Sequence, residues 1–125
     1  MRLLLDTHIF LWSLDDDPKL SSAAWSLIEA ADTVYVSAAS LWEATIKYHL
    51  GKLHVEPDRL VGAVTASGFS ELPISLQHAV AISRLPALHR DPFDRLLIAQ
   101  AMIEPLHLLT ADAQLEAYST LVRLV

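Results

Sequence analysis

The segment from Pro92 to Thr110, PFDRLLIAQAMIEPLHLLT, joins a strongly apolar helix to an apolar strand. A helix is predicted over Pro92–Ile103, because proline suits the first turn of a helix and apolar residues follow it. Leu106–Thr110 is then predicted to be a strand, since it is short and apolar with little alternation. Strands of this kind are typical of a parallel sheet that helices cover on both faces.

The rest of the chain continues this alternation of helices and strands. The predicted strands are Arg2–Leu5, Thr33–Val36, Phe69–Pro73, Leu106–Thr110 and Leu121–Val125. The predicted helices are Leu20–Ala31, Ser37–Leu50, Pro57–Ser67, Ser75–Leu85, Pro92–Ile103 and Ala111–Ala117. Gly51 and Gly68 are expected to close two of these helices in the left-handed conformation. The predicted fold class is α/β: a three-layer α/β/α sandwich with a five-stranded parallel sheet, formed by residues 1–125 as one domain.

The composition excludes several classes of protein. The chain has 125 residues, and the absence of cysteine excludes a disulfide scaffold and a thiolate zinc site. With 53% hydrophobic and only 19% charged residues, the chain is not expected to be disordered. The longest stretch without charged residues, Leu72–Ser83, is too short to cross a membrane. Asp6 follows the first leucines too early for a signal peptide, so a soluble cytoplasmic protein is expected.

The net charge of -6 argues against a broad basic surface that binds nucleic acid. That argument does not hold if several of the carboxylates form one metal site. The mean hydropathy of +0.35 is high for a small monomer, and it suggests an apolar face that a partner covers.

Four acidic residues fall where a ligand site of a parallel sheet is expected, beyond the carboxyl ends of the strands. They are Asp6 after the first strand, Glu43 in the helix after the second, Asp94 in the first turn of the Pro92–Ile103 helix, and Asp112 after the strand ending at Thr110. Each also has a structural interpretation. Asp6 could cap the turn into Thr7–Leu14, Asp112 could complement a helix dipole, and Asp91 and Asp94 could cap their own helix.

Glu43 is harder to explain as a structural residue. It shares a helical stripe with Ala39, Ile46 and Leu50, so its carboxylate should face inward, although an ion pair with Lys47 is the alternative. Inward carboxylates are costly unless they are paired or bind a metal, and four at one edge would repel one another. Oxygen ligands without cysteine favour magnesium or manganese over zinc. Two such ions about 3.5–4 Å apart can promote phosphodiester hydrolysis.

The sequence also resembles a known family. Its segments LLLDTH, SLWEATIK, RDPFDRLLIAQA and LLTAD are similar, in order and spacing, to PIN domains, and more narrowly to VapC-type toxins of toxin–antitoxin pairs. The resemblance implies a five-stranded parallel sheet and a metal-dependent endoribonuclease with one or two magnesium or manganese ions. It also implies homodimers and an antitoxin partner that covers apolar surface.

The resemblance assigns roles to particular residues. It implies that Asp6 and Asp94 bind the metal directly, that Glu43 binds metal or a metal-bound water, and that Asp112 can act through water. Thr7 and Thr110 match hydroxyl positions that support such a site.

Basic and aromatic residues outside the acidic set are also candidates for contacts to RNA. His8, Arg90 and Arg95 are candidate contacts to RNA phosphates, although His8 could equally be packed or face solvent, and the arginines could offset Asp91 and Asp94. Lys47, Lys52 and Arg59 could form a modest basic rim. Trp12, Trp25 and Trp42 each lie in a helical apolar pattern, which favours core or interface positions over base stacking.

The leading hypothesis is a metal-dependent endoribonuclease, the toxin of a toxin–antitoxin pair, that hydrolyses RNA to 3′-hydroxyl and 5′-phosphate ends. The alternative is a catalytically inactive PIN-like module that binds proteins. A phosphorylated receiver domain of similar length is excluded, because the third predicted strand runs into Pro73-Ile74-Ser75 instead of the aspartate that accepts the phosphoryl group.

Overall fold

A computed structural model describes residues 1–88 and 90–125, which form a five-stranded parallel sheet in the order β3-β2-β1-β4-β5. The strands are β1 (Arg2–Leu5), β2 (Thr33–Ser37), β3 (Ser70–Leu72), β4 (His107–Thr110) and β5 (Val122–Leu124). Every neighbouring pair is parallel, so each connection returns the chain to the same end of the sheet. The predicted sheet is therefore confirmed.

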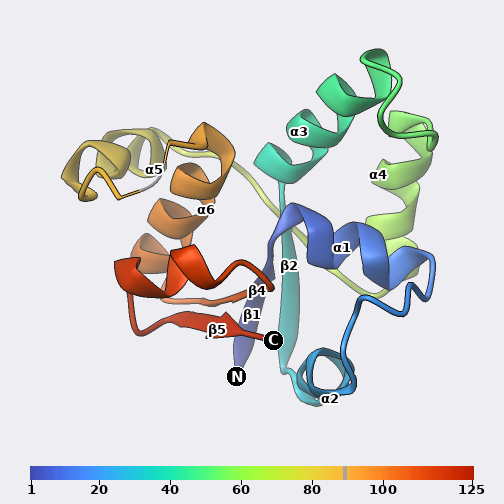
Figure 1. The fold of residues 1–125 in the computed structure, drawn as a ribbon, viewed down its shortest axis with the longest axis horizontal. Helices are drawn as coiled ribbons and strands as arrows, with labels where there is room; N and C mark the ends of the chain where they lie inside the picture. Colours follow the sequence, from blue (N-terminus) through green and yellow to red (C-terminus); the bar gives the residue numbers. More distant parts are fainter. Residues whose placement is uncertain (89) are drawn as a thin grey trace.

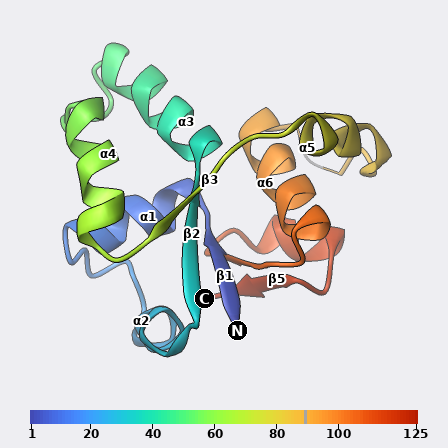
Figure 2. The same cartoon turned by 180° about the vertical axis from the view of Figure 1, so that it is seen from behind.

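The connections between the strands are mostly helical (Figures 1 and 2). The α-helices are α1 (Thr7–Leu14), α2 (Ser22–Ala30), α3 (Ala38–His49), α4 (Pro57–Ala66), α5 (Leu76–Ala81) and α6 (Pro92–Ile103). Two short 3-10 helices are η1 (Ile82–Arg84) and η2 (Ala113–Tyr118). No helix in the described part of the chain is long and apolar enough to cross a membrane.

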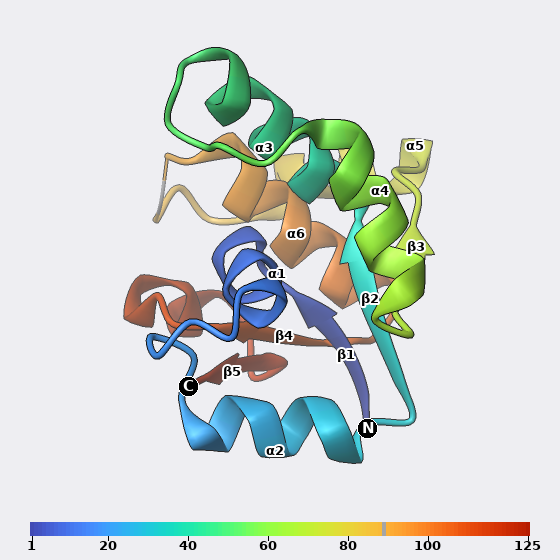
Figure 3. The same cartoon turned by 90° about the vertical axis from the view of Figure 1, so that its right-hand side faces the viewer.

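Helices cover both faces of the sheet, as the three-layer prediction requires. Figure 1 shows α1, α2 and α4 on one side of the strands and α5 and α6 on the other. In Figure 3, turned by a quarter, α3 lies beyond one end of the strands and α2 near the other. Helix α3 contributes to both layers, since Ala44 packs into the core beside α1 and α4, and Ala39 into the core beside α6.

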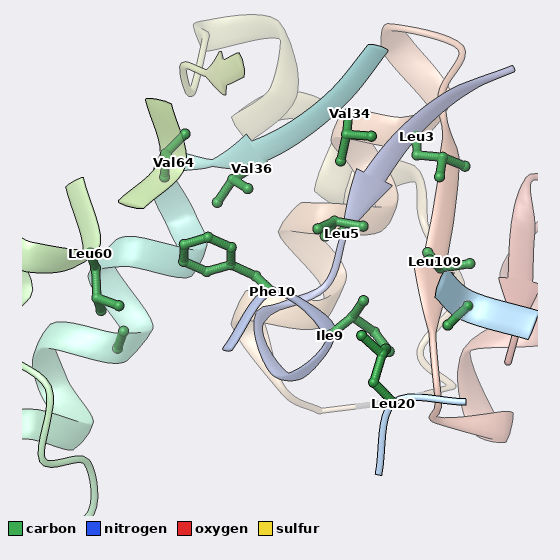
Figure 4. Packing of buried hydrophobic residues seen from close by; sticks show 12 residues of the cluster. Leu3, Leu5, Ile9, Phe10, Leu20, Val34, Val36, Leu60, Val64 and Leu109 are labelled. Carbon is green, nitrogen blue, oxygen red and sulfur yellow. The ribbon is translucent and has the colours of Figure 1, made fainter. Parts of the chain in front are cut away.

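Successive residues of the central strand enter different cores. Leu3 and Leu5 pack with Ile9 and Phe10 of α1 (Figure 4). Leu4 lies in the opposite core with α6. All three leucines have no exposed surface. Because side chains alternate across a strand, a strand that is buried on both faces carries apolar residues at successive positions. This explains the uninterrupted apolar run of Leu3, Leu4 and Leu5.

The predicted elements are present, with shifts at their ends. The predicted helix Ser75–Leu85 divides into α5 and η1, and the predicted helix Ala111–Ala117 is the 3-10 helix η2. Thr7–Leu14, for which no helix or strand was predicted, forms a helix of 8 residues that Asp6 caps. Gly51 and Gly68 have positive φ angles of 74° and 79°, as predicted for glycines that end helices.

Candidate functional site

The carboxyl ends of three central strands meet at one edge of the sheet. Leu5, the last residue of β1, is in register with Val36 of β2 and with Leu109 of β4. The residues that follow these positions therefore emerge side by side. Asp6, Ser37 and Thr110 occupy this edge, and α1 and α3 begin there.

Asp6 is the most strongly constrained acid at this edge. It caps α1, accepting a hydrogen bond at Oδ1 from the Ile9 backbone N–H at 2.8 Å, and Thr110 Oγ1 donates to its Oδ2 at 2.6 Å. Its side chain is only 5% exposed. Burial raises the pKa of the Asp6 carboxyl above its usual range; the bonds from Thr110 and Ile9 and the nearby His8 oppose this, and Glu43 adds to it.

Glu43 lies near enough to Asp6 for the two carboxylates to repel each other. It is 9% exposed, so the inward orientation predicted from its helical stripe is confirmed. Its Oε2 also forms an ion pair with Lys47 Nζ at 3.1 Å, one helical turn further along α3. The inward orientation of Glu43 and its ion pair with Lys47 are thus compatible, because the inward-facing side chain still reaches the partly exposed lysine.

Asp112 is linked to Asp6 through Thr110. The Asp112 backbone N–H donates to Thr110 Oγ1 at 3.0 Å, while the hydroxyl donates to Asp6. The Asp112 side chain caps η2 by accepting from the Gln114 backbone N–H at 2.9 Å. Its expected place at the start of a helix is confirmed, and its half-buried carboxylate lies at the same edge as Asp6.

Asp94 lies in the first turn of α6, half-buried, where α6 packs against α3. Asp91 caps this helix as predicted, accepting from the backbone N–H groups of Phe93 and Asp94. The ring of Phe93 meets that of Trp42 edge-on, with centroids 5.0 Å apart. Glu43 directly follows Trp42 on α3, and Asp94 directly follows Phe93 on α6. The aromatic contact therefore lies beside both acidic residues, on two neighbouring helices.

The basic candidates differ in their surroundings. The Arg95 guanidinium donates to the carbonyl oxygens of Pro86 and Ile82 and to Tyr118 Oη, so it ties α6 to the preceding segment and to η2. Arg90 is exposed. His8 is also exposed, with its ring tilted against that of Trp12 at 5.9 Å.

The remaining basic and aromatic candidates lie outside the core or at its margin. Lys52 and Arg59 are exposed, as expected for a basic rim. Trp12 and Trp25 pack against the core beside α1 and α2. Trp42 is 58% exposed, so it is not a core residue, and its apolar pattern marks an outer helix face.

The carboxylates at this edge come together in part. Among residues 1–88 and 90–125, no three aspartate, glutamate or histidine side chains lie close enough to hold one metal ion. Asp6 and Glu43 remain two buried carboxylates close enough for the charge of Glu43 to raise the pKa of Asp6, and no lysine or arginine of the described residues forms an ion pair with Asp6. A magnesium ion usually keeps several waters and takes one or two carboxylates, so this oxygen-donor pair fits such an ion.

Sequence reasoning missed three polar residues buried beside the edge. Ser40 accepts a hydrogen bond from Thr7 Oγ1 at 3.0 Å. Ser37 caps α3 and donates to Gln100 Oε1 at 2.6 Å. Two features of the sequence could have revealed them. Ser40 precedes Glu43 by three positions on one helical stripe, and Gln100 is a polar residue inside an apolar helix.

Gln100 also holds the segment after β3. Its Nε2 donates to the Pro73 carbonyl oxygen at 3.2 Å and lies 3.3 Å from Nδ1 of the buried His78. His78 Nε2 is hydrogen-bonded to Glu104 Oε2 at 2.7 Å. This network joins α3, α5 and α6 on the side of the sheet away from α1.

Comparisons with known proteins agree with this architecture. The family model described as PIN domain matches residues 3–121. No curated protein was found to match the chain.

Several solved structures share the fold at low sequence identity. VapBC2 from Rickettsia felis, bound to a DNA fragment from its promoter, has a TM-score of 0.71 and 17% identity, covering 100% of this chain and 98% of that one. A toxin–antitoxin complex from Klebsiella pneumoniae has a TM-score of 0.68 and 20% identity, covering 97% and 95%. FitAcB from Neisseria gonorrhoeae has a TM-score of 0.65 and 18% identity, covering 90% and 89%.

Proposed function

Because the chain belongs to the PIN domain family, we propose that it is a metal-dependent endoribonuclease that hydrolyses RNA at the edge formed by Asp6, Glu43, Asp94 and Asp112. The observation that carries the proposal is the buried Asp6 carboxylate beside Glu43, without a lysine or arginine ion-pair partner among the described residues. Two adjacent buried carboxylates are costly in a protein interior unless a cation offsets them.

Asp6 and Glu43 are the proposed ligands of a magnesium or manganese ion, with Asp94 as a further direct ligand and Asp112 acting directly or through water. One ion or two would serve this purpose. A bound divalent ion lowers the pKa of water and offsets the charge that develops on the phosphate. The expected products are a 3′-hydroxyl and a 5′-phosphate.

The chain's own residues prepare Asp6 for this role. The Thr110 hydroxyl and the Ile9 backbone N–H donate to different oxygens of its carboxylate, and both lower its pKa against the effect of burial. Each oxygen keeps lone pairs for a further ligand, since a carboxylate has about four acceptor sites. Thr110 therefore orients Asp6 and favours its ionised form. Thr7, the residue after Asp6, donates a hydrogen bond to Ser40 of the neighbouring helix α3.

The exposed side chains around the edge are proposed to bind the RNA. Arg90 and His8 are exposed near Asp91 and Asp6 and are suited to contact phosphates. Arg95 is proposed as a further contact whose guanidinium is already held by three oxygens of the protein. Lys47 partly offsets the charge of Glu43, which reduces repulsion of the substrate.

We further propose that the protein is the toxin of a toxin–antitoxin pair and forms a homodimer. One of the structures of similar fold, from K. pneumoniae, is a toxin–antitoxin complex. This chain also exposes large apolar side chains on α3 and at its C-terminal end, on α4 and on α5, which an antitoxin or second subunit would cover. They are Trp42, Leu50, Val61, Leu76 and Val80.

The test is RNA cleavage by the purified protein with magnesium, compared among three variants. Asp6→Asn and Glu43→Gln should abolish cleavage while circular dichroism shows the fold intact. Asp16→Asn is the matched control, because Asp16 is exposed and has a positive φ of 51°, which asparagine adopts readily. Cleavage by Asp6→Asn at the wild-type rate would refute the proposal.

A second candidate is a catalytically inactive PIN-like module that binds proteins. It is favoured by one observation, that no three acidic or histidine side chains of the described residues converge on a common ion. A magnesium titration followed by calorimetry separates the two. The nuclease proposal requires saturable binding that Asp6→Asn abolishes, and the binding module requires none.

A further inference from the structure

The two buried carboxylates differ in how they are held. Asp6 is fixed by α1 through Ile9 and by β4 through Thr110. Glu43 has one hydrogen-bonded or ion-paired partner among residues 1–88 and 90–125, Lys47, which lies on its own helix. The position of Glu43 relative to Asp6 therefore depends on how α3 is held against α1.

One side-chain hydrogen bond joins α1 to α3 within the described residues. Thr7 Oγ1 donates to Ser40 Oγ at 3.0 Å, and both side chains are buried. Thr7 is the residue after Asp6, and Ser40 lies three positions before Glu43, on the same face of α3. The bond thus spans the two helices at the level of the two carboxylates.

This bond lies in the protein interior, between two helices that adjoin the carboxylates. Thr7 is 3% exposed and Ser40 is 1% exposed, so water has little access to either hydroxyl. A buried bond of this kind fixes the two helices more firmly than a surface contact would, because losing it leaves buried hydroxyls without partners.

We propose that Ser40 is a positioning residue, which holds Glu43 beside Asp6 through its hydrogen bond to Thr7 and so sets the affinity of the site for a divalent cation. The proposal rests on the metal-binding role proposed above for Asp6 and Glu43. Residues that orient metal ligands without touching the ion typically change metal affinity by about 10- to 100-fold when they are replaced.

The experiment measures Mn²⁺ affinity from the paramagnetic resonance signal of the free ion, without RNA. Ser40→Ala should weaken Mn²⁺ binding by about 10- to 100-fold, and it should fold, because alanine is a better helix former than serine. Ser40→Thr keeps the hydroxyl and should restore the affinity. Thr45→Val is the matched control: it removes a hydroxyl from the same helix, but within residues 1–88 and 90–125 Thr45 Oγ1 donates only to the Leu41 carbonyl oxygen of α3 itself.

A double-mutant cycle tests the pathway through Thr7. Thr7→Val should weaken Mn²⁺ binding as Ser40→Ala does, and the double variant should bind no more weakly than either single variant, because both remove the same bond. Urea unfolding without metal gives the folded fraction of each variant. The Mn²⁺ affinities are compared under conditions where Ser40→Ala and Thr45→Val are both fully folded, so that a general loss of stability cannot explain a difference in affinity.

The possible failures are distinguishable. If Ser40→Ala and Thr45→Val bind Mn²⁺ equally well, or if the effects of Thr7→Val and Ser40→Ala simply add, the positioning role of Ser40 is wrong and the metal site stands. If the wild-type protein binds Mn²⁺ no more tightly than Asp6→Asn, the proposed function fails, and this inference fails with it.

Discussion

Replacing Thr110 by valine tests how the protein keeps a carboxylate ionised in its interior. Valine has nearly the same shape, so the packing at this fully buried position should persist. The change removes the donor to Asp6 Oδ2, at 2.6 Å, and the acceptor of the Asp112 backbone N–H, at 3.0 Å. Two polar groups lose a partner from one conservative substitution.

The expected loss of stability follows from those two bonds. A hydrogen bond to a charged group contributes about 1.5–3 kcal/mol, and a neutral one about 1 kcal/mol. With Asp6 ionised, Thr110→Val should therefore lower the free energy of unfolding by about 2–4 kcal/mol. The larger part comes from Asp6, because its carboxylate is 5% exposed and has little access to water as a replacement donor.

The loss should depend on pH. Burial raises the pKa of the Asp6 carboxyl above its ordinary value of 3.8, and the Thr110 hydroxyl opposes this, so Thr110→Val raises the pKa further. An acid whose pKa is higher in the folded state destabilises the protein once ionised. The difference between variant and wild type is therefore fully present above the variant's folded pKa. Its charged part is lost as the pH falls from there through the wild type's folded pKa, which itself lies above 3.8.

Urea unfolding at a series of pH values measures this directly in metal-free protein. Thr45→Val is the control, because its hydroxyl bonds to a carbonyl oxygen and the effect should not vary with pH. A loss for Thr110→Val that stays the same at every pH from 3 to 9 would refute the assignment of Thr110 as the donor that stabilises ionised Asp6.

Three further predictions concern metal binding and packing. Magnesium at about 100 times its Kd should stabilise the wild type by about 2.7 kcal/mol. In calorimetry this corresponds to a rise in Tm of about 10 °C. EDTA should reverse the rise, and the Tm of Asp6→Asn should not change with magnesium. Gln100→Leu deprives the Ser37 hydroxyl and the Pro73 carbonyl of partners and should cost about 2–4 kcal/mol in urea unfolding, whereas a cost below about 1 kcal/mol would contradict the network. Phe10→Ala, at a position without exposed surface, should cost about 3–5 kcal/mol in the same assay, and a smaller cost would show that the core relaxes around it.

The fold followed from the sequence because its strands are buried on both faces. The run Leu3, Leu4 and Leu5 supplies alternate side chains to two separate cores, so a parallel sheet between helices is the arrangement that buries all three. Helix ends were less predictable. Ile82–Arg84 tightens into a 3-10 turn after α5, although the apolar pattern of the sequence continues through it.

The candidate site was predictable in position and less so in detail. The rule that ligands collect beyond the carboxyl ends of parallel strands located Asp6 and Asp112, and helical spacing predicted that Glu43 faces inward. Spacing within one helix cannot show a bond between helices, so the link from Thr7 to Ser40 was not foreseen. For Trp42 the sequence left core and interface positions open, because an apolar stripe does not reveal which faces have a neighbour, and its 58% exposure excludes the core.

The proposed metal-dependent cleavage of RNA at the acidic edge can be tested in cells. RNA ends are sequenced after brief expression of the wild type and of Asp6→Asn. We expect new ends at defined positions with the wild type, each pair carrying a 5′-phosphate and a 3′-hydroxyl, and none with Asp6→Asn. New ends that also appear with Asp6→Asn, or that carry 2′,3′-cyclic phosphates, would contradict it.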